Sequence, residues 1–118
     1  MNERREHPRF KVNVPVEIHA EGATAPLHCA TSDLSLGGCY VEMAIPIKVG
    51  TKVTVSIWIG QAKAAAEAEV AHFTPGFGVG IRFTKISNQD LGIIGQYLNS
   101  LAPLARKPLL GNMPRTAN

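Results

Sequence analysis

The sequence predicts an all-β fold, a small antiparallel barrel of six strands followed by one C-terminal helix. Short segments of alternating apolar and polar residues recur between turn signals through most of the chain, and one later stretch carries apolar residues at helical spacing. The length of 118 residues, with 45% hydrophobic residues, suits one domain with a single core. Strands repeated every roughly 8–12 residues are typical of small barrels.

The first half of the chain contains three of the expected strands. Residues 10–20 place apolar side chains at every second position, which is the pattern of a half-buried strand. Pro15 falls in the outward-facing set, which favours a sheet edge or a bulge there. Residues 26–32 give a weaker strand signal, and residues 39–44 return as the third strand.

The second half supplies the other three strands. Residues 51–59 give the clearest alternation in the chain. Residues 62–73 are ambiguous, because alanine and glutamate favour helix while the alternation and the flanking turns favour strand, which we choose. Residues 77–83 contain two glycines, which suggest close packing or bending at a barrel corner.

A helix is expected to begin at Ser87, whose hydroxyl can cap it while Asp90 completes a capping-box-like pair. Its apolar stripe continues through residue 101, and Pro103 is expected to end it. The barrel and helix therefore form one domain over residues 10–101. Residues 102–118 are expected to be a disordered tail.

The charges lie mainly at the two ends of the chain. Lys and Arg total 12 against 9 Asp and Glu, so the net charge of +3 favours an anionic partner without naming one. Residues 1–9 are polar and charged and contain Pro8, so we expect a flexible basic arm. Aromatic residues make up only 6%, which is low for a protein that stacks many bases of a single strand.

The sequence favours the cytoplasm. Cys29 and Cys39 are interpreted as reduced core thiols, because a small disulfide-built domain usually carries more cysteines. The N-terminus lacks the apolar run of a signal peptide, and the longest nearly uncharged stretch, residues 53–62, is too short to span a bilayer. We expect no membrane insertion.

Signals of catalysis are absent from the sequence. It contains no nucleophile elbow, phosphate-binding loop, paired-histidine zinc motif or Cys-x-x-Cys. The four histidines are scattered along the chain. We therefore expect a protein that is not an enzyme and that has no metal and no cofactor.

Two short constellations carry binding chemistry. Arg5 and Arg9 lie four residues apart on the arm, and their planar guanidinium groups can grip a phosphate or the O6 and N7 edge of guanine. The alternative is a solvated basic terminus. Asp33 can accept from the N1 and N2 donors of guanine, Ser35 offers a hydroxyl, and Gly38 permits positive φ and close approach of a ligand. The alternative there is a plain turn.

Together, these residues resemble the PilZ domain family. Its signature is Arg-x-x-x-Arg followed by Asp/Asn-x-Ser-x-x-Gly, and both are intact here as Arg5 and Arg9, then Asp33, Ser35 and Gly38. The strand at residues 78–83 also resembles the Gly-Ile-x-Phe strand of the family. The resemblance spans roughly residues 4–101. It implies a six-stranded PilZ-type barrel with a C-terminal helix, in agreement with the strand and helix pattern.

The resemblance also implies a ligand, the bacterial second messenger cyclic di-GMP. In the family, the arginines grip phosphate and stack on or hydrogen-bond guanine, and the second motif contacts a guanine. The residue before the arginine pair helps to set one ligand or a stacked pair, and Arg4 at that position favours the pair. We expect an adaptor, a monomer or weak dimer, whose arm closes on the ligand and whose new surface signals to an unidentified effector protein in motility, biofilm or exopolysaccharide control.

Two other functions stay open. One is a nucleotide-independent scaffold of the same fold, although such members usually lack the two motifs. The other is a nucleic-acid-binding small barrel, which the mild charge, the few aromatics and the acidic Asp33 disfavour, so no nucleic-acid partner is expected.

Overall fold

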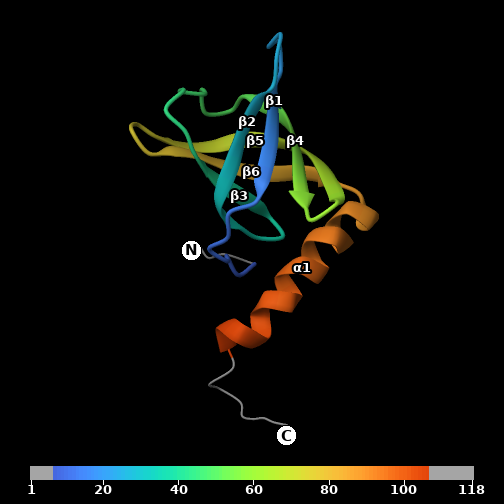
Figure 1. Ribbon diagram of the computed structural model, residues 1–118. Helices are drawn as coiled ribbons and strands as arrows, with labels where there is room; N and C mark the ends of the chain where they lie inside the picture. The colour runs from blue at the N-terminus through green and yellow to red at the C-terminus, as the bar shows by residue number, and fades with distance from the viewer. Residues whose placement is uncertain (1–6, 107–118) are drawn as a thin grey trace, which may run out of the picture.

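The structure, a computed structural model, describes residues 7–106 and forms a closed barrel of six antiparallel strands with one helix. The elements are β1 (Pro15–Ala20), β2 (Leu27–Leu34), β3 (Gly38–Glu42), β4 (Lys52–Ile59), β5 (Ala62–Thr74), β6 (Gly78–Ile86) and α1 (Asn88–Arg106). The strands follow the order β1-β2-β3-β6-β5-β4 around the barrel, and β1 pairs with β4 to close it (Figure 1). The predicted fold class is confirmed.

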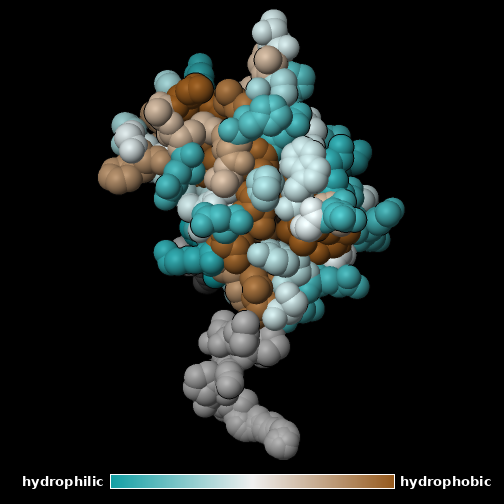
Figure 2. Space-filling view, viewed as in Figure 1, coloured by the Kyte–Doolittle hydropathy of each residue, from teal (hydrophilic) through white to brown (hydrophobic). Residues whose placement is uncertain are grey.

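The alternation read from the sequence sorts side chains between the barrel interior and the outside. In β4, Val53, Val55 and Ile57 are buried while the residues between them are more exposed. Figure 2 shows hydrophilic residues over much of the face toward the viewer, with apolar residues at the upper left and between the hydrophilic residues at the centre. Within the described part of the chain, the exposed large apolar side chains are Ile45, Val49 and Phe77, which lie in connections between strands.

The ambiguous segment at residues 62–73 is a strand, as predicted, and forms β5. It pairs with β4 on one side and β6 on the other, so its backbone hydrogen bonds are made within the sheet. Three of its alanines, Ala64, Ala66 and Ala68, are buried in the core and alternate with more exposed residues. Pairing on both sides therefore overrides the helix propensity of alanine and glutamate.

The first strand is shorter than predicted, because β1 begins at Pro15 instead of residue 10. Proline has no N–H to donate to a ladder, so it is tolerated as the first residue of a strand. The preceding segment is held beside β2 by the buried Thr31, whose hydroxyl accepts from the Val14 N–H at 3.1 Å and donates to the Val12 carbonyl at 2.7 Å. This attachment carries the arm toward the β2–β3 turn.

The second strand is longer than predicted and includes Asp33, which the sequence had placed in the turn. A register shift between Thr31 and Asp33 marks a bulge in the pairing of β2 with β3. A bulge re-aims the side chains that follow it. The turn that remains is only residues 35–37.

The predicted helix cap is confirmed. The Ser87 hydroxyl accepts from the backbone N–H of Asp90 at 3.0 Å and donates to the Asp90 carboxylate at 3.0 Å. Ile94 and Leu98 are buried where α1 packs on β5 and β4 (Figure 1). No helix in the described residues is long and apolar enough to cross a bilayer.

The predicted helix end is wrong. The helix continues past Pro103 to Arg106, so residues 102–106 are not part of a disordered tail. Proline lacks one hydrogen bond in a helix, but its fixed φ near −65° is itself helical, so one further turn can follow. The expectation for residues 107–118 lies outside the described residues.

Candidate functional site

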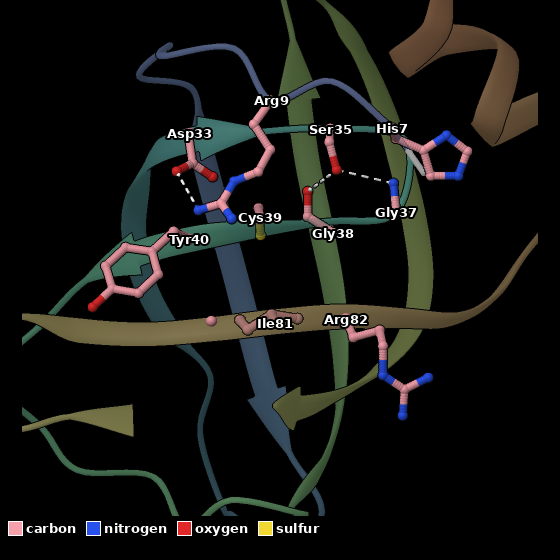
Figure 3. Close-up of a pocket in the computed structure, with 11 residues that line it drawn as sticks. His7, Arg9, Asp33, Ser35, Gly37, Gly38, Cys39, Tyr40, Ile81 and Arg82 are labelled. Atoms are coloured by element: carbon pink, nitrogen blue, oxygen red, sulfur yellow. Dashed lines mark hydrogen bonds and ion pairs between the residues drawn. The ribbon is translucent and has the colours of Figure 1, made fainter. Parts of the chain in front are cut away.

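The sequence-predicted residues that the structure describes meet at one cavity on the barrel wall. It has a volume of about 210 Å³ and lies between the end of the arm, the β2–β3 turn and β6 (Figure 3). Its lining residues are His7, Arg9, Asp33, Ser35, Gly37, Gly38, Cys39, Tyr40, Gly80, Ile81 and Arg82. Arg9, Asp33, Ser35 and Gly38 are therefore together, as the two motifs predicted.

An ion pair joins the two motifs directly. The Arg9 guanidinium donates to the Asp33 carboxylate at 3.1 Å (Figure 3). Two backbone hydrogen bonds, from Phe10 N–H to the Leu34 carbonyl at 3.0 Å and from Leu34 N–H to the Phe10 carbonyl at 2.9 Å, hold the adjoining residues together. The Arg9 side chain is 41% exposed and that of Asp33 is 19% exposed, so both charged groups can be reached from solvent.

Ser35 is buried and its polar groups are used within the turn. Its N–H donates to the Gly38 carbonyl at 2.9 Å, and its hydroxyl accepts from the Gly37 N–H at 3.1 Å. The hydroxyl also lies 3.4 Å from the Gly38 carbonyl, to which it donates. The plain-turn interpretation accounts for these contacts, and contact of Ser35 with a ligand stays a prediction.

Gly38 has a structural role that the sequence did not predict, and close approach of a ligand to its main chain stays a prediction. It does not have the positive φ expected from the sequence. Instead, a Cβ at this position would fall far inside contact distance of the Ile81 carbonyl oxygen and 3.2 Å from the Arg82 Cα. Because those are backbone atoms of β6, glycine is needed here so that β3 and β6 can pair closely.

Arg4 and Arg5 lie outside the described residues, so their roles stay predictions. The described part of the arm begins at His7, whose ring packs over the turn. A Cβ on Gly37 would lie 3.1 Å from the His7 Cδ2. The arm therefore enters the site from the side of the turn.

Sequence reasoning missed two outward-facing residues of the cavity, Tyr40 and Arg82. Tyr40 pairs with Asp33 on one side and Gly80 on the other, and Arg82 pairs with Gly38. The alternation of the third and sixth strands could have placed both on the outer face. Their proximity to the motifs depends on β3 pairing with β6, which no local pattern indicates.

Cys39 lies beneath this surface. Burial, together with the Asp33 carboxylate and Cys29, raises the pKa of Cys39 to about 12. Burial also raises the pKa of the partly exposed Cys29. Both cysteines are free, as the sequence predicted. Because the thiolate is the reactive form, neither is an activated nucleophile.

These pKa shifts give a testable difference between the two thiols. At pH 8, a disulfide-exchange reagent is expected to modify Cys29 slowly in the folded protein and to spare Cys39 until urea is added. The Cys29→Ser variant should then show no reactive thiol when folded, which absorbance of the released thiolate measures. Rapid native labelling in Cys29→Ser would contradict the burial of Cys39.

The described residues hold no group of three or more histidine, cysteine, aspartate or glutamate side chains that could bind a metal ion. The chemistry assembled at the cavity is that of a cation paired with a carboxylate, beside the aromatic ring of Tyr40. Such a set suits a ligand that presents both anionic oxygens and hydrogen-bond donors.

Comparison with known proteins identifies the family. The family model described as the PilZ domain matches residues 3–100. No curated protein matches the sequence.

Several solved structures share the fold. The PilZ domain with c-di-GMP of YcgR from Escherichia coli has a TM-score of 0.69 at 20% identity, over 90% of this chain and 97% of that one. The Bacillus subtilis inhibitor of motility, MotI/DgrA, has a TM-score of 0.71 at 17% identity, over 86% of this chain and 53% of that one. This chain thus spans about half the length of MotI/DgrA. The PilZ domain of CeSA from a cellulose synthesizing bacterium has a TM-score of 0.64 at 23% identity, over 80% and 98% of the two chains.

Proposed function

This chain belongs to the PilZ domain family, and on that premise we propose that it is a cyclic di-GMP receptor that signals to a partner protein. The observation that carries the proposal is the Arg9–Asp33 ion pair. It supports a single site built from both motifs, because it joins residues that are 24 positions apart in the sequence. The similar YcgR domain was solved with c-di-GMP.

Ligand binding would break the ion pair between Arg9 and Asp33 and give each residue a new partner on the ligand. Cyclic di-GMP carries two phosphates and two guanines. Asp33 would accept from the N1 and N2 donors of a guanine, and the released Arg9 would donate to a phosphate or stack on a base. Asp33 would exchange its contact with Arg9 for two hydrogen bonds from guanine, and Arg9 would exchange its contact with Asp33 for a phosphate or a base. Arg5 would add a second phosphate donor and Arg4 would favour a stacked pair of ligands.

The output would be a change in the surface formed by the arm and the barrel rim. Residues 1–9 would close over the bound nucleotide, and a partner protein would read the new surface. The similar MotI/DgrA is an inhibitor of motility, which supports an output in motility, biofilm or exopolysaccharide control. The proposal places the protein in the cytoplasm, as a monomer or weak dimer, and assigns it no catalytic step.

Calorimetric titration with cyclic di-GMP, with GTP and cyclic AMP as controls, tests the receptor function. Saturable heat is expected with cyclic di-GMP alone, because only that ligand presents two guanines and two phosphates to the two motifs. A ratio near two ligands per protein would support the stacked pair at Arg4. No heat with cyclic di-GMP would reject the receptor and favour the nucleotide-independent scaffold.

A further inference from the structure

Arg82 is a second cation at the cavity, but its side chain points away from the cavity. Its main chain pairs with Gly38 in the β3–β6 ladder, and it lines the same cavity as Arg9. Its guanidinium donates to the Glu69 carboxylate of β5 at 2.7 Å. In Figure 3 the Arg82 side chain is directed away from Arg9 and Asp33. Of the charged residues that the structure describes in the cavity lining, Arg82 is thus the one that forms an ion pair with a residue that does not line the cavity.

Among the described residues, the neighbours of Arg82 on the cavity side of the barrel wall are glycines. The residue opposite it on β3 is Gly38, and the preceding residue on the same face of β6 is Gly80. Neither glycine has a side chain, and neighbouring strands are only about 4.8 Å apart. Rotation about the side-chain bonds of Arg82 therefore carries its guanidinium from β5 to the space above β3.

The ion pair that holds Arg82 is easily exchanged. The Arg82 side chain is 58% exposed and that of Glu69 is 30% exposed. Ion pairs so exposed to water contribute little, because solvent screens them and the long side chains lose freedom in forming them. A charged phosphate can accept two parallel hydrogen bonds from one arginine. It therefore competes well with Glu69, which makes a single contact with Arg82.

We propose that Arg82 is a second anion-binding residue of this site and that Glu69 restrains it until ligand binds. The inference rests on the proposed function and deepens it, because a cyclic dinucleotide has two phosphates, and Arg9 and Arg82 line the same cavity from the arm and from β6. Arg82 binds the phosphate, or the guanine edge, on the β6 side. Glu69 keeps the site open when ligand is absent and lowers the affinity when it is present.

Titration of cyclic di-GMP into four variants tests this inference. Arg82→Ala is expected to weaken binding about tenfold, the loss of one charge-assisted contact. Glu69→Gln is expected to tighten it by about two- to fivefold, because the restraint on Arg82 is removed. Lys85→Ala is the matched control, since it removes an exposed positive charge of β6 outside the cavity lining.

A double variant separates restraint from simple repulsion. In Arg82→Ala/Glu69→Gln, the gain from Glu69→Gln is expected to disappear, because there is no arginine to release. A gain that persists means that Glu69 merely repels the ligand, which overturns its restraining role. Arg82→Ala binding no more weakly than Lys85→Ala overturns the anion-binding role. Wild-type protein that fails to bind at all rejects the proposed function itself, which is a different result.

Discussion

Arg9→Ala is expected to weaken cyclic di-GMP binding by about 100-fold or more while leaving the unfolding temperature almost unchanged. Charge-assisted hydrogen bonds contribute about 1.5–3 kcal/mol each, and the loss of two accounts for about 3 kcal/mol or more, which exceeds about 100-fold in affinity. The fold should persist, because the Arg9 side chain is 41% exposed and its contact with Asp33 is a surface ion pair. Calorimetric titration and thermal unfolding measure the two quantities.

Two control variants sharpen this experiment. Lys48→Ala removes an equal charge from an exposed loop outside the cavity and should bind normally. Arg9→Lys keeps the charge but loses the planar fork, so its affinity should fall between those of wild type and Arg9→Ala. If Arg9→Ala binds like wild type, the site has been assigned to the wrong residues.

Gly38→Ala is expected to lose about 3–5 kcal/mol of folding free energy, a large loss for a single substitution. The added methyl group would overlap the Ile81 carbonyl oxygen and lie 3.1 Å from the Ile81 carbonyl carbon, both backbone atoms within a paired strand. The clash can be relieved only by separating β3 from β6. Domains of this size are stable by about 5–15 kcal/mol, so a marked fall in the midpoint of urea unfolding is expected.

Gly37→Ala is the comparison that isolates this effect. A Cβ at Gly37 meets the His7 ring at 3.1 Å, and the end of a side chain on the arm can shift where a paired backbone cannot. Its stability should stay within about 1 kcal/mol of wild type. Equal stability of Gly38→Ala and wild type would falsify the packing explanation. Loss of ligand binding in Gly38→Ala would report a distorted barrel, so it would not identify Gly38 as a ligand contact.

The fold was predictable where local pattern decides it. Alternation identified the clearest strands, the turn signals between them completed the count of six, and the cap at Ser87 began the helix as its hydroxyl and Asp90 predicted. The end of the helix was not predictable from Pro103 alone, because a single missing hydrogen bond is tolerated in its last turns. Strand order was also beyond local pattern, since the pairings that close the barrel join distant segments.

The site was predictable as far as its motifs reach. Resemblance to the family brought Arg9 and Asp33 together correctly. The positive φ expected of Gly38 was wrong, and the close packing that requires glycine there was not predictable, because the backbone of β6 lies far along the chain. The pairing of Arg82 with Glu69 depends on the register between β5 and β6, which includes two irregularities, so only the folded protein reveals it.

The order of strands around the barrel also bears on how the protein acquires its site during folding. The β2–β3 hairpin can form early, because only a short turn separates its strands. Strand β6 pairs with β3 only after the chain between them, which contains β4 and β5, has folded back. Bringing the ends of this long segment together has an entropic cost. A partly folded chain therefore carries Asp33 and Ser35 on a hairpin without the wall formed by residues 80–82. The complete cavity exists only in the closed barrel, so the proposed nucleotide binding would report that folding has finished.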